Sequence, residues 1–487
     1  MGSIKPLYAK PSGRLVVVSN RGAWTFRETF HGLKCLPSVS GLVSAIDPVI
    51  TRESGVWIAW GGRYGKKDEI IGVSRAMPEN GSRYIFHEVM LEPREVDLYY
   101  DGFANSCLWP ICHSFVEKSV FNEEHWEAYC KVNEKYAGVV LKTTTPRDLI
   151  WIHDYHLALL PALIRRHRPH ARISLFWHIP FPPAEIFAAM PWAREYISSM
   201  LDAELIGFHT RNYVHNFLQT AGEIAGAEVD YLTGTIYRKD RKTKAVPVPI
   251  GIDWRDLDLL AQSGEVVRKA SQIRQGAGGK YLLVGVDRLD YTKGIPERLK
   301  AFAWLLENYP HYREKITLIQ IAVPSRTNAR AYQELRRQIE ESVGRINGSY
   351  TENYHVPVRY VFKSLSKPEL VAHYLAADMA LVTPVKDGLN LVSKEYVAVK
   401  DNDVGALLLS PFAGSAVQLK EALITNPYNP RETAAKIVQG LEMPVAEKKR
   451  RLKVMNKVVR EQDIYWWWHH LRQSWLGDAA DQGYCIS

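Results

Sequence analysis

The sequence predicts an α/β fold with two halves of similar size, each a parallel sheet covered by helices on both faces. Near-continuous apolar segments rich in β-branched residues alternate with longer amphipathic stretches. That alternation is typical of parallel strands buried on both faces. It is interrupted at residues 245–256, "AVPVPIGIDWRD", where two prolines and a glycine mark a seam. A length of 487 residues and 46% hydrophobic content accommodate two large domains.

Ten segments are predicted to be strands, four in the first half and six in the second. They are residues 15–20, 149–156, 173–182, 204–210, 281–290, 316–325, 358–365, 379–388, 405–414 and 422–427. Amphipathic stretches such as 295–309 and 331–346 are predicted to be helices. Residues 464–476, "IYWWWHHLRQSWL", carry four tryptophans. We expect a helix that packs its rings into a groove, with an aromatic ligand platform as the alternative.

Composition restricts the class of partner. The net charge of +9 suits anionic ligands, from sugar phosphates to nucleic acid. The basic clusters at 165–168, 238–244 and 447–453 lack interleaved aromatic residues, which favours solvated surfaces over a nucleic-acid groove. No apolar run is long enough for a membrane span, and the first ten residues lack the apolar core of a signal peptide.

The five cysteines show no C-x-x-C spacing, which argues against a zinc site or a disulfide framework. We therefore expect a cytoplasmic protein that binds neither nucleic acid nor membrane. Whether the protein is a monomer or a homo-oligomer stays open.

Polar side chains gather at the carboxyl ends of the predicted strands. They are Asn20, Arg21, Asp154, His156, His178, Arg288, Arg326 and Asp387. In open α/β sheets the ligand binds outside the carboxyl ends of the strands. Two such sheets facing each other would form a cleft lined by these residues. The D-x-D sequences at 256–258 and 401–403 lie in an apparent helix and a turn, so we expect no metal site.

The segment "DRLDYTKG", residues 287–294, places Arg288 and Lys293 between a strand and a helix that begins near Pro296. A guanidinium grips phosphate oxygens bidentately and an ammonium supplies a point charge. Together these two cations would hold a diphosphate. The alternative is that they form salt bridges with Asp287 or Asp290.

The segment "KDGLNLVSKE", residues 386–395, combines a loop with a helix that starts near Asn390. The helix N-terminus offers N–H groups to an anion, and Gly388 allows the backbone to approach a ligand closely. Asp387 would bind sugar hydroxyls and Glu395 a ribose diol. The alternative has Asn390 as an N-cap and Glu395 as an acid favoured by the helix dipole.

The segments "WIHDYH", residues 151–156, and "FWHIPFP", residues 176–182, put Asp154 and His178 at the ends of neighbouring strands. An acid and a histidine in that position indicate acid–base chemistry or contacts to a sugar. The alternative is that His178 has only a structural role.

Seven motifs occur in the order seen in trehalose-6-phosphate synthases, and the chain resembles that family from about residue 14 to about residue 475. The motifs are "RLVVVSNRG", "FANSCLWP", "WIHDYHL", "HIPFP", "RLDYTKGIPER", "GRINGSY" and "DGLNLVSKEYV". The resemblance implies a GT-B glycosyltransferase with two Rossmann-like, doubly wound domains and a cleft between them. Residues 1–248, joined by a C-terminal helix at 464–487, would form the acceptor domain, and residues 249–463 the nucleotide-sugar donor domain.

The resemblance also implies roles for individual residues. Arg288 and Lys293 resemble the diphosphate clamp, Leu391 and Val392 the backbone amide donors, and Glu395 the ribose ligand. The full donor-binding set would be Gly41, His178, Arg288, Lys293, Leu370, Asp387, Gly388, Leu389, Asn390, Leu391, Val392 and Glu395. The acceptor-binding set would be Arg21, Trp60, Tyr100, Trp109, Asp154 and Arg326. The catalytic set would be Asp154, His178, Arg288, Lys293 and Asp387.

The chain departs from the family pattern in three places. Ser40 replaces the first glycine of the usual Gly-Gly-Leu loop, and the preceding segment, residues 22–37, is longer than in compact bacterial members. The region expected to contact the base, near Leu365 and Leu370, is not distinctive, so the nucleotide stays undetermined among UDP, GDP and ADP.

The resemblance implies a retaining glucosyltransferase that needs no cofactor. It would move glucose from a nucleotide diphosphate-glucose, with UDP-glucose as the first choice, to glucose 6-phosphate and give α,α-trehalose 6-phosphate. The alternatives are a glucosylglycerol-phosphate synthase, a pseudo-glycosyltransferase that couples cyclitols, and a sugar-phosphate sensor without catalysis. "NSCLWP" and "VVVSNR" match the trehalose type better than the glycerol type.

Overall fold

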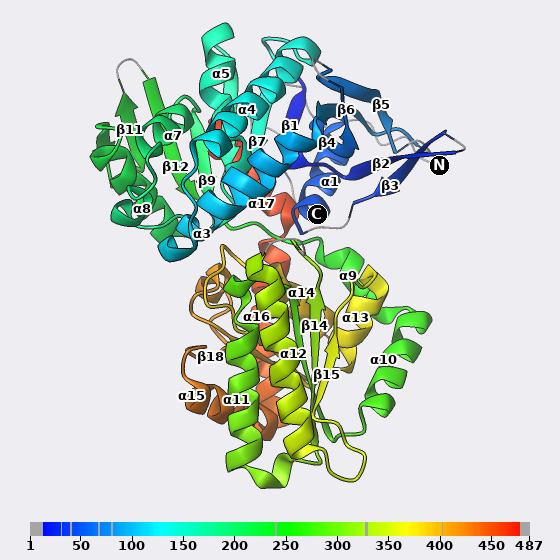
Figure 1. Ribbon diagram of the computed structural model, residues 1–487. Coiled ribbons are helices and arrows are strands. Elements are labelled where there is room, and N and C mark those ends of the chain that lie inside the picture. The colour runs from blue at the N-terminus through cyan, green and yellow to red at the C-terminus, as the bar shows by residue number, and fades with distance from the viewer. Residues whose placement is uncertain are drawn as a thin grey trace. The chain divides into compact units, whose positions relative to one another are not determined.

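The structure is a computed structural model that describes residues 13–30, 32–38, 41–66, 69–78, 81–238, 241–326, 330–401 and 403–477 (Figure 1). The chain divides into two compact units, which we call unit 1 and unit 2. Unit 1 is Met1–Ile250 with Ile464–Ser487, and unit 2 is Gly251–Asp463. Both are α/β, which confirms the predicted fold class. The roles of acceptor domain and donor domain stay predictions.

Within its described residues, unit 1 contains one ten-stranded sheet in the order β10-β11-β12-β9-β8-β7-β1-β4-β6-β5. The strands are β1 Leu15–Arg21, β4 Val56–Tyr64, β5 Ile71–Met77, β6 Tyr84–Leu91, β7 Leu149–His153, β8 Arg172–Phe176, β9 Leu205–Phe208, β10 Glu228–Asp230, β11 Thr235–Arg238 and β12 Arg241–Pro247. The run from β12 to β6 is parallel. The chain enters at the central β1, winds outward through β4 and β6, and returns to β7. The switch point of this doubly wound order therefore lies between β1 and β7.

The prediction for unit 1 was incomplete in two respects. The strands β4, β5, β6, β10, β11 and β12 were not predicted. The sheet is also not wholly parallel, because β5, β10 and β11 pair antiparallel at its two edges. These edge strands are short or half-exposed and carry many polar residues. They therefore lack the continuous apolar run that identifies a buried parallel strand.

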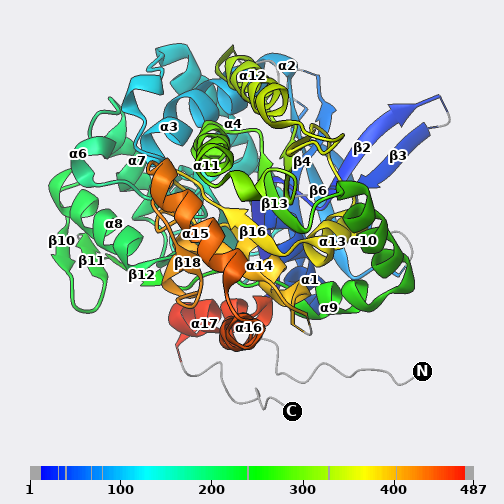
Figure 2. The same ribbon diagram turned by 90° about the horizontal axis from the view of Figure 1, so that it is seen from below.

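The helices of unit 1 cover both faces of its sheet. They are α1 Gly41–Glu53, α2 Pro93–Glu95, α3 Trp109–Cys112, α4 Glu123–Thr143, α5 Leu160–His167, α6 Ala184–Phe187, α7 Ala193–Met200, α8 Arg211–Glu223 and α17 Ile464–Leu476, together with the π-helix Val96–Leu108. A separate ribbon, β2 Trp24–Thr29 and β3 Gly32–Pro37, extends beside β4 (Figure 2). It accounts for the lengthened segment at residues 22–37.

The tryptophan-rich helix α17 packs into unit 1, as predicted. Trp467 and Trp468 are buried, with ring centroids 5.0 Å and 4.6 Å from that of Trp151 on β7. The Trp468 indole also donates to Glu53 Oε1 at 3.0 Å. The helix ends at Leu476. Residues 478–487 of the predicted segment 464–487 lie outside the described part of the chain.

Unit 2 contains a six-stranded sheet, within its described residues, in the order β15-β14-β13-β16-β17-β18. The strands are β13 Tyr281–Arg288, β14 Ile316–Val323, β15 Val358–Val361, β16 Met379–Val382, β17 Ala406–Leu409 and β18 Leu423–Ile424. All neighbours are parallel, and all six strands were predicted. This is the strand order of dinucleotide-binding folds, with the switch point between β13 and β16. All six strands end earlier than predicted. For example, β16 ends at Val382, shortly before Pro384, which cannot donate to a ladder.

Helices cover both faces of the unit 2 sheet (Figures 1 and 2), and a hydrophobic core cluster lies on each face. Alternation along β13 sends Leu282, Val284 and Val286 to one face and Leu283 to the other. The helices are α9 Trp254–Gln262, α10 Gly264–Ala277, α11 Ile295–Asn308, α12 Arg330–Tyr350, α13 Lys367–Ala376, α14 Leu391–Val399, α15 Pro430–Glu442 and α16 Val445–Glu461. No helix in the described ranges combines the length and apolarity that a membrane crossing requires.

Helix α13 begins with a capping box. Ser366 Oγ accepts from the Glu369 amide, and Glu369 Oε2 accepts from the Ser366 amide at 2.9 Å. We expect Ser366→Ala to lower the free energy of unfolding of unit 2 by about 1 kcal/mol, the usual cost of losing a cap. Guanidinium unfolding of the full chain would measure it. Ser342→Ala on the exposed face of α12 is the control, because it removes a serine that caps nothing. Equal stability of the two variants would contradict the prediction.

Candidate active site

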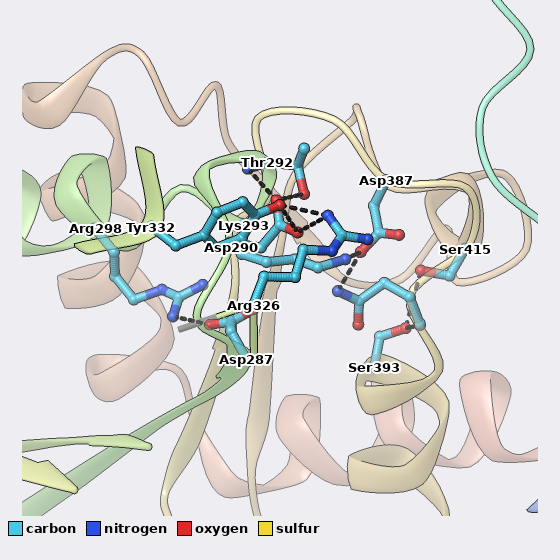
Figure 3. Close-up of polar contacts among 11 residues, drawn as sticks. Asp287, Asp290, Thr292, Lys293, Arg298, Arg326, Tyr332, Asp387, Ser393 and Ser415 are labelled. Atoms are coloured by element: carbon cyan, nitrogen blue, oxygen red, sulfur yellow. Dashed lines mark hydrogen bonds and ion pairs between the residues drawn. The ribbon is translucent and has the colours of Figure 1, made fainter. Parts of the chain in front are cut away.

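The switch point of unit 2 carries an ion pair. Arg288 is the last residue of β13, Lys293 ends the turn that follows it, and Asp387 follows β16. Lys293 Nζ lies 2.6 Å from Asp387 Oδ2, and these side chains are 11% and 13% exposed (Figure 3). Ligands bind at such switch points in open α/β sheets. The fold therefore brings three of the predicted site residues to the edge of the sheet where such folds bind ligands.

The Lys293 turn is fixed by its backbone. Val385 N and Lys386 N both donate to the Thr292 carbonyl, at 2.9 Å and 3.2 Å. Gly294 has a φ of +66°, and a Cβ there would lie 2.4 Å from the Thr383 carbonyl oxygen. Only glycine meets both requirements. The turn after β13 is thus held against the loop after β16.

The loop before α14 bears on one alternative that the sequence left open. Asn390 is the N-cap residue, with a φ of +74°, but its Nδ2 donates to Asp387 Oδ2 at 3.0 Å. Within the part of the chain that the structure describes, the Asn390 side chain makes no capping bond to α14. Asn390 is therefore the N-cap residue, as the alternative had it, but its side chain does not cap the helix. The helix N-terminus, with Leu391 and Val392 in its first turn, keeps the character of an anion site.

Glu395 and Leu370 come from adjacent helices, α14 and α13. Tyr374 Oη donates to Glu395 Oε2 at 3.0 Å. Burial raises the pKa of Glu395, although the Tyr374 hydrogen bond and the Lys367 charge oppose that effect. Leu370 packs against the core cluster beneath both helices. Glu395 is thus a carboxylate held in place by a tyrosine.

The two acids that the sequence offered as partners of Arg288 and Lys293 both form ion pairs with arginines elsewhere in unit 2. Asp287 Oδ2 lies 2.5 Å from the buried Arg298 guanidinium. Asp290 Oδ2 lies 3.4 Å from Arg326 Nη1. The salt-bridge alternative for Lys293 is therefore wrong, because Lys293 pairs with Asp387 across the switch point.

In unit 1, four residues form an aromatic and cationic cluster at the end of β1, and they come from β1, β4, the π-helix and the 3₁₀ turn Tyr155–Leu157. The exposed Arg21 guanidinium carbon lies 3.8 Å from the Trp60 ring centroid and 5.9 Å from that of Tyr100. The ring of Tyr100, which the π-helix carries, stacks on that of His156 with centroids 5.7 Å apart. π-helical turns frequently occur at functional sites. A stacked ring pair and a guanidinium suit a polar ring that bears a phosphate.

Asp154 and His178 meet at the ends of β7 and β8. Asp154 Oδ1 accepts from the His178 amide at 3.3 Å, and Asp154 has a φ of +70°, an uncommon conformation for a residue with a side chain. His178 Nε2 lies 3.0 Å from His153 Nδ1. Burial, and then the charges of His153 and His209, place the pKa of His178 well below its ordinary value. A neutral His178 carries one donor and one acceptor nitrogen, and its Nε2 already faces His153.

Two predicted residues lie apart from these clusters, and two more lie inside the loop at the switch point of unit 2. Trp109 is 4% exposed and packs on His113, with ring centroids 4.1 Å apart. Gly41 is exposed at the start of α1, and Ser40 lies outside the described residues. Gly388 and Leu389 are buried in the loop that joins Asp387 to Asn390.

Two residues that contact predicted site residues, His153 and Tyr332, were not predicted from the sequence to belong to the site. His153 belongs to the motif "WIHDYH" beside a residue that was chosen. Tyr332 lies in the amphipathic repeat of α12, where it reads as one more core position. Only the fold places it beside Arg326.

A cavity of about 580 Å³ lies elsewhere in unit 2. Asp378 and Val404, which precede β16 and β17, line it, so it lies at the amino ends of these strands. Its two cations are paired, Arg274 with Asp378 at 2.5 Å and Lys400 with Asp403. Ligands of open α/β sheets bind at the carboxyl ends of the strands, so this cavity is not a candidate for the active site.

Residues 13–475 match glycosyltransferase family 20. The chain is 36% identical over 457 residues to the UDP-forming α,α-trehalose-phosphate synthase A of Dictyostelium discoideum, covering 94% of this chain and 61% of that relative. The chain therefore spans less than two thirds of that relative's length.

Two solved structures extend the likeness to the fold. One is an α,α-trehalose-phosphate synthase from Burkholderia xenovorans in complex with glucose-6-phosphate, with 33% identity, a TM-score of 0.87, and coverage of 96% of this chain and 100% of that one. The other is from E. coli and is bound with UDP-2-fluoro glucose, with 33% identity, a TM-score of 0.87, and coverage of 95% and 99%. With the two doubly wound sheets, these matches confirm the predicted GT-B fold class.

Proposed function

The chain belongs to glycosyltransferase family 20, and from that membership and its site geometry we infer that it transfers glucose from UDP-glucose to glucose 6-phosphate with retention, giving α,α-trehalose 6-phosphate. The observation that carries this proposal is the Lys293–Asp387 pair at the switch point of unit 2, beside the N-terminus of α14. The ligands named for the two related structures support the choice of donor and acceptor.

We assign donor binding to unit 2. Arg288 and Lys293 would hold the diphosphate, together with the first amides of α14. Glu395 would accept hydrogen bonds from the ribose, and Asp387 and His178 would contact the glucose. The donor domain would then be residues 249–463 and the acceptor domain residues 1–248, completed by α17.

We assign the acceptor to Arg21, Tyr100 and Arg326, whose two guanidiniums and one hydroxyl suit a phosphate dianion. Trp60, Trp109 and Asp154 would select for a hexose ring. Free glucose lacks the anion that these arginines would bind.

The reaction would proceed on one face of the donor sugar. The bond between the anomeric carbon and the phosphate oxygen breaks, the acceptor oxygen bonds to that carbon, and the acceptor proton passes to the leaving phosphate oxygen. A double displacement would need a carboxylate free to attack. Asp387 is a poor candidate, because Lys293 and Asn390 both bind its Oδ2. Electrostatic stabilisation of the departing diphosphate would supply most of the catalysis.

We expect activity to persist in excess chelator, because Arg288, Lys293 and the α14 dipole supply the positive charge that a divalent ion would otherwise provide. In the described residues no group of three or more histidine, cysteine or carboxylate side chains is arranged for a metal. Product formation in EDTA, with and without added Mg²⁺ or Mn²⁺, would test this. Loss of activity in EDTA with rescue by either ion would contradict it.

We further infer a cytoplasmic location. Cys35, Cys107, Cys112 and Cys130, the cysteines within the described ranges, are free thiols, as is usual in a reducing compartment.

The transfer is tested by the release of nucleotide diphosphate from UDP-, GDP- and ADP-glucose, each with and without glucose 6-phosphate. We expect the fastest release with UDP-glucose, and only when glucose 6-phosphate is present. If the protein binds UDP-glucose and glucose 6-phosphate but releases no UDP, the alternative of a sugar-phosphate sensor without catalysis is favoured.

A further inference from the structure

Asp290 is a fully buried carboxylate whose two oxygens serve two different segments of unit 2 (Figure 3). Oδ1 accepts from Thr292 N at 3.0 Å and from Thr292 Oγ1 at 2.9 Å, which fixes the turn that carries Lys293. Oδ2 faces Arg326 Nη1 at 3.4 Å and accepts from Tyr332 Oη at 3.2 Å. The cation assigned to the donor and the one assigned to the acceptor thus share a single buried anion.

The charge of Asp290 is maintained by its neighbours. Burial opposes ionisation, but the positive charges of Arg326, Arg288 and Lys293 outweigh it and lower the pKa of Asp290. The carboxylate therefore stays ionised and balances part of the positive charge at the switch point.

Tyr332 completes the fixation of Arg326. It lies in the first turn of α12 and is buried. Its hydroxyl accepts from Arg326 Nη1 while donating to Asp290, and its ring centroid lies 5.4 Å from the Arg326 guanidinium carbon. Arg326 itself has a φ of +49°, an uncommon conformation for a residue with a side chain. Such backbone conformations cluster at ligand-binding sites, where surrounding contacts maintain them.

We propose that Tyr332, acting with Asp290, is a positioning residue for the acceptor phosphate: its hydroxyl orients the Arg326 guanidinium, and Asp290 ties that guanidinium to the Lys293 turn. The proposal rests on the proposed function, in which Arg326 binds the phosphate of the acceptor. Without the Tyr332 hydroxyl, Arg326 keeps its charge and its ion pair with Asp290. Its guanidinium, however, samples more orientations. Binding of the phosphate then becomes weaker, whereas the donor contacts of Lys293 stay in place.

The test compares Tyr332→Phe with Tyr312→Phe, which removes a matched hydroxyl. Tyr312 is also buried in unit 2, and its hydroxyl donates to a carboxylate, Glu442 Oε1, at 2.8 Å, away from the switch point. We expect Tyr332→Phe to raise the KM for glucose 6-phosphate about tenfold, within the range for losing one hydrogen bond to a charged group. The kcat and the KM for UDP-glucose should change less than about twofold on the same argument, and Tyr312→Phe should change none of the three.

A double-mutant cycle with Arg326→Ala gives the second measurement. If Tyr332 acts through Arg326, Tyr332→Phe has no further effect on the KM for glucose 6-phosphate once Arg326 is alanine. Additive effects of the two changes, or equal effects of Tyr332→Phe on donor and acceptor, would overturn the proposal. If Arg326→Ala raises that KM and Tyr332→Phe does not, only the positioning role is wrong. If Arg326→Ala leaves it unchanged, the acceptor assignment itself fails.

Discussion

Alanine in place of Arg288 or Lys293 is expected to lower kcat by about 10²- to 10³-fold, the range for removing one preorganised group that stabilises charge in a transition state. As the donor bond breaks, negative charge develops on the departing diphosphate at the switch point. A cation already fixed there stabilises that charge without reorganisation. Lys293 is fixed by the Gly294 turn and the Thr292 carbonyl, and Arg288 by its place at the end of β13.

Two controls separate this effect from loss of structure. Lys293→Ala leaves the Asp387 carboxylate without its closest cation, so each variant needs a guanidinium unfolding curve beside its kinetics. Arg337→Ala and Lys457→Ala remove cations of the same kind from exposed helix faces of unit 2 and should leave kcat unchanged. Normal turnover in both switch-point variants would contradict the assignment of the diphosphate site.

Glucose 6-phosphate is expected to exceed glycerol 3-phosphate as an acceptor by at least about 10²-fold in kcat/KM, because a site built to bind hydroxyls rejects an analogue that leaves its polar groups unpaired. The phosphate does not discriminate, since both acceptors offer one to Arg21 and Arg326. Discrimination must come from the ring hydroxyls, through groups such as Asp154 and the Trp60 face beside Arg21.

The same assignment predicts a specific effect of Arg326→Ala. It should raise the KM for glucose 6-phosphate far more than that for UDP-glucose, and free glucose should be a very poor acceptor for the unaltered protein. Steady-state kinetics with the three acceptors at saturating UDP-glucose would measure these differences. Comparable kcat/KM values for the two phosphorylated acceptors would contradict the hexose preference.

The sequence predicted unit 2 better than unit 1 for a physical reason. The four inner strands of the unit 2 sheet are β14, β13, β16 and β17. They are buried along almost their whole length, so each forms an apolar run that stands out in the sequence. In unit 1, β4 begins with the buried apolar run at residues 56–60 and was missed despite that signal, whereas β10 and β11 are short, partly exposed edge strands. Such strands give no continuous apolar signal.

The candidate site could be predicted as a set of residues but not as a network. Motif order placed Lys293 and Asp387 in one site, yet their direct pairing depends on two loops that are 94 positions apart in the chain. Asn390 illustrates the same limit, because local sequence favours a side-chain cap and only the position of Asp387 turns its amide away. Tyr332 gave no signal, since its helical periodicity is that of a core residue.

The most direct test of the proposed transfer is the structure of its product. The full chain is incubated with UDP-glucose and glucose 6-phosphate, and the product is isolated and analysed by NMR. We predict a disaccharide phosphate whose two anomeric carbons share one oxygen, both in the α configuration, formed in equal amount to the UDP released. A β configuration at the transferred glucose, a linkage to another hydroxyl, or release of UDP with free glucose alone would contradict it.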